Sequence, residues 1–255
     1  MPSLLPSNFS ASARCLQDKI ILVTGAGDGI GRAAALSFAQ HGATVVLLGR
    51  TVDKLEAVYD EIEAAGYPQA AIYPMHLRGA AMKDYQDLAA TIEKEFGRLD
   101  GLLHNAGMLG ERRTLAQTSP ESWDDVLHVN ITAAFMMTQA LLPMLSAAET
   151  GSIVLTSSSV GRKGRAFWGP YAVSKFATEG FMQVLAEEEF DLNSTRVNTI
   201  NPGATQTVMR RTAYPGENPS DNPLPDTIMP LYLYLMSDDS RAANGQQFDA
   251  QPKTL

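Results

Sequence analysis

The sequence predicts an α/β protein, a doubly wound parallel sheet of about seven strands with helices on both faces. Three observations lead to this prediction. Short apolar runs of strand length alternate with helix-length segments along the whole chain. Glycine or proline follows several of these segments, as expected where helices and strands end. Of the 255 residues, 45% are hydrophobic and 19% are charged, which is enough apolar material for a full core.

The expected strands are apolar runs, most of them rich in β-branched residues. They are Lys19–Thr24, Ala43–Leu48, Ala70–Met75, Leu99–His104, Gly151–Ser157, Thr195–Asn201 and Gln246–Ala250. The expected helices have apolar residues at helical spacing or are rich in alanine. They are Ile30–Gln40, Val52–Ala65, Ala81–Phe96, Ser119–Ala148, Tyr171–Leu192 and Thr227–Ser237. Because a parallel crossover needs a connection of helix length, the alternation predicts parallel strands.

No change in composition, linker or internal repeat divides the chain, so residues 18–255 are expected to form a single domain. Residues 1–17 are expected to be an N-terminal extension, either frayed or docked on the surface. The stretch 214–225 contains four prolines and no apolar period, which predicts a loop. A substrate loop is expected near residues 205–227.

Charge and composition limit the partners of the chain. The net charge of −8 argues against nucleic acid, because phosphate contacts need clustered lysine and arginine. No continuous apolar run reaches the ~18 residues of a membrane helix, so no membrane span is expected. The single cysteine, Cys15, excludes an intramolecular disulfide and a zinc site built on cysteine pairs, and no metal is expected. With no leader-like segment in residues 1–17, a cytoplasmic location is expected.

The predicted helix Ser119–Ala148 has few polar side chains. From Val129 to Leu145 the clearly polar ones are Asn130, Thr132, Thr138 and Gln139. A surface helix needs a polar face about as wide as its apolar stripe, so this helix is expected to be buried nearly all round. Two explanations are open, which are packing under the neighbouring helix and loops, or a subunit interface. The second predicts a homodimer or homotetramer formed through helices 119–148 and 171–192.

A glycine-rich segment, Thr24-Gly25-Ala26-Gly27-Asp28-Gly29-Ile30-Gly31, joins the first strand to a helix. Glycines in this context let the backbone approach a pyrophosphate closely, and the N-terminus of the helix attracts the anion. A glycine-rich turn without a ligand is the alternative. We predict a dinucleotide-binding loop in which Gly25, Gly27, Asp28, Gly29, Ile30 and Gly31 contact the cofactor.

The spacing T-G-x-x-x-G-x-G resembles that of the short-chain dehydrogenase/reductase family, and the resemblance extends from Lys19 to the end of the chain. It implies a Rossmann-type fold with the strand order 3-2-1-4-5-6-7 and two further cofactor segments. Asn105-Ala106-Gly107 is similar to the family's N-A-G segment, and Pro202-Gly203-Ala204-Thr205-Gln206-Thr207 to its P-G-x-x-x-T segment, which implies contacts from Thr205 and Thr207. After its third strand the family usually has an acid that holds the adenine. This chain has His76 and Leu77 there, so Leu77 is expected to border the cofactor and the role of His76 is open.

The end of the second strand, Leu48-Gly49-Arg50-Thr51, bears on the choice between NAD and NADP. An acid there holds the ribose 2′-hydroxyl of NAD, whereas an arginine binds the 2′-phosphate of NADP. Gly49 takes the acidic position, so NADP(H) is favoured over NAD(H), with contacts from Arg50 and Thr51. Asp28 is a mild counter-indication, since many NADP-binding relatives have a basic residue there. Alternatively, Arg50 is a solvated charge at the strand end.

Tyr171 and Lys175 are four residues apart on a predicted helix and share one face. A free tyrosine has a pKa near ~10, and the neighbouring ammonium is expected to lower it. Ser158 lies 13 residues before Tyr171, and Asn130 lies 28 residues before Ser158; these spacings and the pattern S-x-x-G resemble the family's catalytic tetrad. The resemblance implies that Ser158 binds the substrate oxygen and Tyr171 exchanges the proton. It also implies that Lys175 tunes Tyr171 and holds the nicotinamide ribose, and that Asn130 fixes a water. For Asn130, a buried structural role is the alternative.

These residues predict an NADP(H)-linked oxidoreductase that interconverts a carbonyl and an alcohol by hydride transfer. One alternative is a nucleotide-binding regulatory or scaffold protein with little turnover. Another is an epimerase or dehydratase, whose usual T-G-x-x-G-x-x-G motif is absent. Ketones, quinones, sugars and acyl thioesters are all open as the small-molecule substrate, and Phe167 and Trp168 are expected to border its pocket. Arg162, Lys163 and Arg165 either meet an anionic substrate or lie on a solvated turn.

Overall fold

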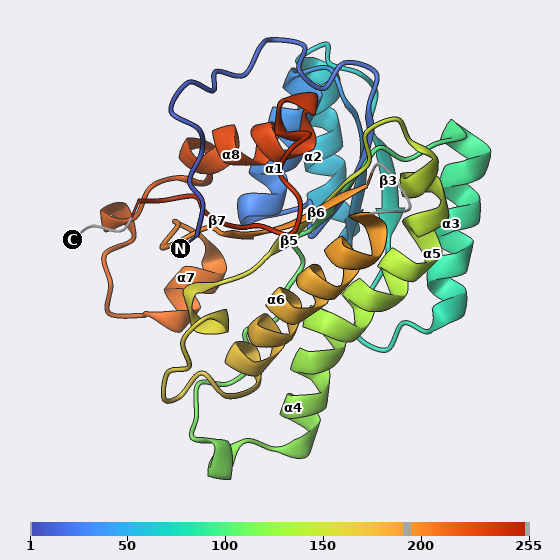
Figure 1. Ribbon diagram of the computed structural model, residues 1–255. Coiled ribbons are helices and arrows are strands. Elements are labelled where there is room, and N and C mark those ends of the chain that lie inside the picture. Colours follow the sequence, from blue (N-terminus) through green and yellow to red (C-terminus); the bar gives the residue numbers. More distant parts are fainter. Residues whose placement is uncertain (1, 191–194, 253–255) are drawn as a thin grey trace.

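The computed structural model describes residues 2–190 and 195–252, which contain one seven-stranded sheet with helices on both faces (Figure 1). The strand order is β3-β2-β1-β4-β5-β6-β7 and every neighbouring pair is parallel, so the predicted fold class and order are confirmed. The strands are β1 Ile20–Thr24, β2 Thr44–Gly49, β3 Ala71–Pro74, β4 Gly101–His104, β5 Ser152–Thr156, β6 Arg196–Asn201 and β7 Gln247–Asp249.

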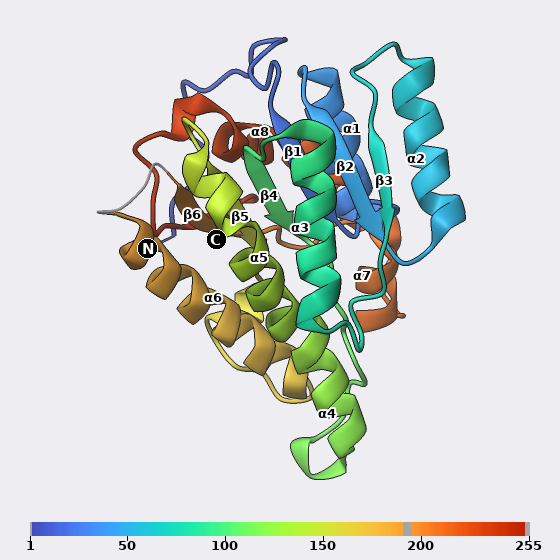
Figure 2. The ribbon, with the colours of Figure 1, turned by 90° about the vertical axis from the view of Figure 1, so that its right-hand side faces the viewer.

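The helices form two layers that enclose the sheet. The first layer contains α1 (Gly29–Gln40), α2 (Val52–Ala64) and α8 (Met229–Met236), and the second contains α3 (Met82–Phe96), α5 (Ala133–Ala147) and α6 (Gly169–Phe190) (Figure 2). Successive residues of a strand point to opposite faces of the sheet, so the side chains of β1 pack alternately against the two helix layers. Ile21 and Val23 pack in the core with α1, and Leu22 packs in the core with α3 and α5.

Two predicted helices differ clearly from the observed ones, and a third, α6, begins at Gly169 rather than at the predicted Tyr171. A 3₁₀ turn, Pro225–Ile228, precedes α8 where the sequence predicts helix from Thr227. The predicted end of the α6 helix, Leu192, lies outside the described residues. The predicted helix Ser119–Ala148 consists of α4 (Pro120–Leu127), a π-helical turn at His128–Thr132, and α5.

The run from Pro120 to Ala147 is long and apolar enough, by length and composition, to cross a membrane. Met137, Leu141 and Leu145 are nevertheless buried against the sheet, as in a core helix. The prediction that this helix is buried nearly all round is wrong, since Phe135 is 47% exposed. The sheet covers one side of the helix, whereas on the side that carries Phe135 the ring packs edge-on against Phe181 of α6 and is otherwise open to solvent.

The N-terminal segment, residues 2–17, docks beside the last strand. The Ser3 amide donates to the Gln247 carbonyl over 2.7 Å, and the Asp249 amide donates to the Ser3 carbonyl over 2.9 Å. Leu16 is fully buried. The segment therefore adds a bridge to the free edge of β7, which would otherwise leave its backbone groups unpaired.

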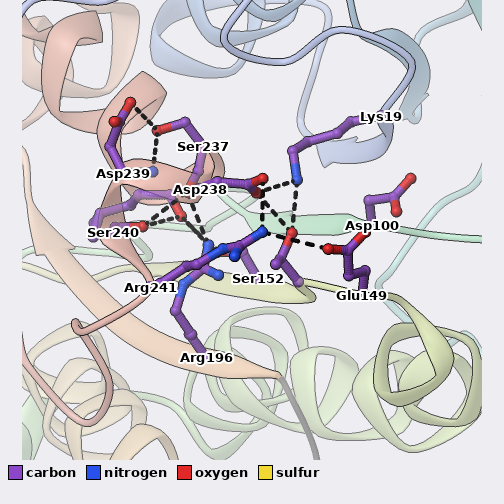
Figure 3. A network of polar contacts seen from close by, with 12 residues as sticks. Lys19, Asp100, Glu149, Ser152, Arg196, Ser237, Asp238, Asp239, Ser240 and Arg241 are labelled. Carbon is purple, nitrogen blue, oxygen red and sulfur yellow. Dashed lines mark hydrogen bonds and ion pairs between the residues drawn. The ribbon is translucent and has the colours of Figure 1, made fainter.

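A polar network joins the amino ends of the strands to the segment after α8 (Figure 3). Lys19 donates to Asp238 over 2.8 Å and to Thr150 over 2.9 Å. The buried Arg196 donates to the Ser237 carbonyl over 3.1 Å, and Arg241 pairs with Asp238. In folds of this kind, ligands bind at the carboxyl ends of the strands. The contacts of this network fix the opposite edge of the sheet.

Candidate active site

The glycine loop between β1 and α1 is closely packed. A Cβ atom on Gly31 would lie 2.2 Å from the Gly25 carbonyl oxygen, so only glycine fits there. Asp28 is the N-cap of α1, and its carboxylate accepts from the Gly29 amide over 2.7 Å. The loop thus brings backbone N–H groups and a helix N-terminus to the carboxyl edge of the sheet, as an anion site requires.

Asp28 is neutralised from a second element. Lys54, in the first turn of α2, forms an ion pair with the Asp28 carboxylate. The hydrogen bond from Lys54 is the largest effect on the pKa of Asp28, which lies below its usual value. Arg50 and Thr51, at the end of β2, line the same cavity as this pair.

The Asn105-Ala106-Gly107 segment ties the end of β4 to the end of β1. The amides of Asn105 and Ala106 both donate to the Thr24 hydroxyl, over 2.9 and 3.0 Å, and Asn105 Nδ2 donates to the Thr24 carbonyl over 3.2 Å. These bonds fix the two strand ends that flank the glycine loop. Gly107 and Leu77 line the cavity nearby, as does His76.

The segment after β6 lies close to the glycine loop. Thr207 caps a short helix, α7 (Val208–Ala213), and its methyl carbon is 3.3 Å from the position that a Cβ on Gly29 would take. Gln251 Nε2 donates to the carbonyls of Pro202 (2.9 Å) and Ala204 (2.8 Å) and so holds this segment from the C-terminal side. The sequence indicated neither α7 nor Gln251, because six residues are too few for a helical period and a glutamine near a chain end has no motif.

Tyr171, Lys175 and Ser158 converge where β5 meets α6. Lys175 Nζ donates to the Thr156 carbonyl over 2.7 Å and lies 5.7 Å from the centre of the Tyr171 ring. Ser158 lines the same cavity as these two residues, and its side chain acts on the Tyr171 hydroxyl in the direction that lowers the tyrosine pKa. A Cβ on Gly161 would lie 2.7 Å from the Lys175 carbonyl oxygen, so the glycine of S-x-x-G lets the serine loop pack against the helix.

Burial controls the protonation of this pair. It raises the pKa of Tyr171 to about 12, against an opposing hydrogen bond from Ser158. It lowers the pKa of Lys175 to about 8, against an opposing attraction from the Glu179 carboxylate. The expected lowering of the Tyr171 pKa by Lys175 is therefore wrong for the chain without a ligand. The physical reason is that both groups are buried, and the ammonium is directed at the Thr156 carbonyl.

Asn130 lies in the π-helical turn, and its side chain forms hydrogen bonds to other residues of the protein. Its Oδ1 accepts from the Met108 amide over 2.7 Å, and its Nδ2 donates to the Met108 carbonyl and to the Ser174 hydroxyl, each over 2.9 Å. This is the bonding expected of the structural alternative. Beside it lies a cavity of about 10 Å³, lined by His104, Asn130 and Lys175 among others. That volume is about the size of one water molecule.

A buried carboxylate on α6, Glu179, connects this helix to three other segments of the chain. It accepts from Ser157 Oγ over 2.5 Å, from Arg162 Nε over 3.1 Å and from Thr199 Oγ1 over 2.8 Å. Arg162 also donates to Asp249 over 2.6 Å. Arg162 is thus an internal brace, and both of its predicted roles, a substrate contact and a solvated turn, are wrong. Nothing in the sequence indicated this pairing, because 17 residues separate Arg162 from Glu179.

One cavity of about 660 Å³ at the carboxyl edge of the sheet brings most of the predicted site residues together. Gly31 and Asn130 are not in its lining; the first is buried in α1 against the Gly25 carbonyl, and the second lines the small cavity. The predicted residues that line it are Gly25, Gly27, Asp28, Gly29, Ile30, Arg50, Thr51, Leu77, Asn105, Ala106, Gly107, Ser158, Tyr171, Lys175, Pro202, Gly203, Thr205 and Thr207. Trp168 lines the cavity as expected, whereas Phe167 is 53% exposed and does not. Lys163 and Arg165 are exposed.

A glycine loop and a Ser-Tyr-Lys group that line one cavity of a doubly wound sheet are the arrangement expected of a dinucleotide site. Residues 19–218 match the family of short chain dehydrogenases. The chain belongs to this family of oxidoreductases, and the predicted membership is confirmed.

Individual relatives are close in sequence and in structure. YciK of Escherichia coli K12, an uncharacterized oxidoreductase, is 53% identical over 237 residues, which are 93% of each chain. A short chain dehydrogenase from Shigella flexneri 2a, solved in complex with NADP, is 52% identical with a TM-score of 0.92, covering 94% of this chain and 100% of that one. One from Escherichia coli CFT073, solved with NADPH, is 53% identical with the same TM-score and coverage.

Proposed function

We propose that this chain is an NADP(H)-dependent oxidoreductase that interconverts a carbonyl and an alcohol by hydride transfer, with Tyr171 as acid and base. The observation that supports it most directly is the single cavity that contains both the glycine loop and the group Ser158, Tyr171 and Lys175. A dinucleotide-binding protein without catalysis has no need of a buried tyrosine and lysine at that place.

The residues at the β1 and β2 ends of the cavity suit NADP(H). The glycine loop and the α1 N-terminus hold the pyrophosphate, and Arg50 holds the 2′-phosphate. Relatives at 52 and 53% identity bind NADP and NADPH in their solved structures. When bound, NADPH supplies the hydride, which favours reduction as the direction of the reaction.

Side chains of the protein transfer the proton that the reaction requires. In reduction, the Tyr171 hydroxyl donates its proton to the substrate oxygen, while the Ser158 hydroxyl donates a hydrogen bond to the same atom. The Lys175 ammonium stabilises the phenolate that remains and holds the nicotinamide ribose. The phenolate regains its proton through Lys175 and a water in the small cavity beside Asn130.

Steady-state oxidation of NADPH across ketones, quinones, sugar ketones and acyl thioesters tests this function. We expect turnover with at least one class, lowered by about 10²–10⁴-fold in Tyr171→Phe, with Ser159→Ala as a control that leaves turnover intact. Tight NADPH binding without turnover of any compound would instead support a regulatory or scaffold protein. Failure to bind NADPH would contradict the proposal outright.

We also propose that α5 and α6 pair with a second copy of the chain to form a homodimer or homotetramer. Phe135, Val173, Phe176 and Val184 on these helices are between 41% and 59% exposed, an apolar face that water does not favour. Sedimentation of the wild type should give a dimer or tetramer, and Phe176→Glu should weaken it, whereas Leu4→Glu, at another exposed apolar site, should not. A monomeric wild type would contradict this assembly. A cytoplasmic location completes the proposal and suits a chain with one cysteine.

A further inference from the structure

Lys54 occupies an unusual place between α2 and the glycine loop. It is the third residue of α2, four positions after Arg50. A Cβ on Gly27 would lie 2.9 Å from the Lys54 Cβ, so the absence of a side chain at Gly27 lets the first turn of α2 rest on the loop. Lys54, Asp28, Arg50 and Gly27 all line the large cavity. The ammonium of Lys54 therefore belongs to the cofactor end of the site, although it comes from a different element than the loop.

Without Lys54, the cofactor end of the cavity has too little positive charge to bind a phosphate beside the Asp28 carboxylate. Asp28 alone would repel an anion at the entrance to the glycine loop. Within the described parts of the chain, Arg50 forms no ion pair, so its guanidinium is free to bind a ligand. A phosphate monoester carries about −1.5 to −2 charges at neutral pH, which one guanidinium facing one carboxylate cannot match. Arg50 and Lys54 together provide two cations against the single carboxylate of Asp28.

The Lys54–Asp28 ion pair is weak, so the Lys54 ammonium can also bind a ligand. The two side chains are 54% and 50% exposed, and exposed pairs of this kind contribute at most about 1 kcal/mol. The second oxygen of Asp28 is already committed to the Gly29 amide. Arg211 on α7 also acts on Asp28 electrostatically, so the carboxylate keeps a cationic neighbour when Lys54 turns to a phosphate.

We propose that Lys54 is a specificity-determining residue for NADP(H): its ammonium binds the 2′-phosphate together with Arg50 and replaces the basic residue that position 28 lacks. Until the cofactor binds, the Asp28 carboxylate holds the Lys54 ammonium beside the glycine loop. The inference rests on the proposed NADP(H)-linked function and extends it to a residue outside the strand end and the glycine motif.

Binding of NADPH and NADH to the full chain, measured by calorimetry, tests the proposal. Lys54→Met should weaken NADPH binding by about tenfold or more, the loss expected for one charge-assisted contact, and leave NADH binding within about twofold. Asp28→Asn should strengthen NADPH binding more than NADH binding, because NADPH carries the additional charge of the 2′-phosphate that the carboxylate repels. Arg32→Met is the matched control, since it removes the ion pair with Glu61 between the same two helices without touching the cavity.

The outcomes separate this inference from the function on which it rests. An equal loss of NADPH and NADH binding in Lys54→Met would give Lys54 a merely structural role and overturn the inference. A wild-type preference for NADPH that survives Lys54→Met would overturn it as well, and would leave the NADP(H)-linked function in place. A wild type that binds neither nucleotide would overturn the function itself. Adenosine 2′,5′-bisphosphate and AMP, used as fragments, should show the same contrast as NADPH and NADH.

Discussion

Lys175 donates from Nζ to the carbonyl oxygen of Thr156 over 2.7 Å, and through this bond the helix that carries Tyr171 is fixed to the strand that leads to Ser158. The ammonium thereby stays beside the Tyr171 ring although it forms no hydrogen bond with the phenol. The position of the lysine is set by the backbone of β5, and its charge is set by burial and by Glu179.

The pH dependence of reduction should follow Lys175. The value of kcat/KM reports the ionisations of the free enzyme, in which the Lys175 pKa is about 8 and that of Tyr171 is about 12. Tyr171 therefore keeps its proton across the neutral range, and we expect kcat/KM for reduction to fall above about pH 8 as Lys175 loses its charge. A profile from pH 6 to pH 10 measures this. A flat profile up to about pH 10 would be inconsistent with the assignment.

Glu179→Gln should alter both stability and the pH profile. The glutamine keeps the shape of the side chain but leaves Arg162 with one carboxylate instead of two, and the loss of a buried charge partner costs about 3 kcal/mol in the free energy of unfolding. The Glu179 carboxylate also raises the pKa of Lys175, so its removal should shift the fall in kcat/KM to lower pH. Urea unfolding and the pH profile measure the two effects. A lower stability with an unchanged profile would limit Glu179 to a structural role.

His104→Asn should make the protein less sensitive to acid. His104 is buried with Nε2 2.8 Å from Thr138 Oγ1, and burial, helped by the charge of Lys175, lowers its pKa to about 3. Between pH 6.5 and pH 4 the unfolded chain takes up a proton that the folded chain does not, which costs about 3 kcal/mol of stability. Unfolding free energies at these two pH values should differ less in His104→Asn than in the wild type. The exposed His76→Asn is the control, and equal slopes in all three proteins would refute the prediction.

Arg50→Asp should reverse the cofactor preference. The aspartate removes the charge-assisted contacts to the 2′-phosphate and adds repulsion, while it offers an acceptor to the ribose hydroxyl of NAD. We expect the ratio of kcat/KM for NADPH to that for NADH to fall by at least about tenfold. An unchanged ratio would mean that Arg50 is a solvated charge at the strand end.

The sheet was predictable because each strand is a separate apolar run. All seven observed strands lie within two residues of the predicted bounds, from Lys19–Thr24 to Gln246–Ala250. The glycine loop and the pair Tyr171 and Lys175 were predictable for a similar reason, since their chemistry depends on spacing along one segment. Ser158 was selected by a short pattern, and Gly161 in that pattern proves to be a packing requirement.

Features that depend on distant contacts were not predictable. The brace from Arg162 to Glu179 and Asp249 joins three separate segments, and the pair Asp28 and Lys54 joins two. The sign of the Tyr171 pKa shift depends on how deeply the fold buries the phenol, which no spacing reveals. The exposed side of α5 was missed because an apolar helix face looks the same in sequence whether the chain covers it or not.

Turnover and NADPH affinity of Tyr171→Phe, measured together on the best carbonyl substrate of the wild type, test the central claim most directly. Removal of the one hydroxyl should lower kcat by about 10²–10⁴-fold, the range for a general acid, while the Kd of NADPH changes by less than about twofold. Turnover within about tenfold of the wild type, at the same NADPH affinity, would mean that Tyr171 does not deliver the proton.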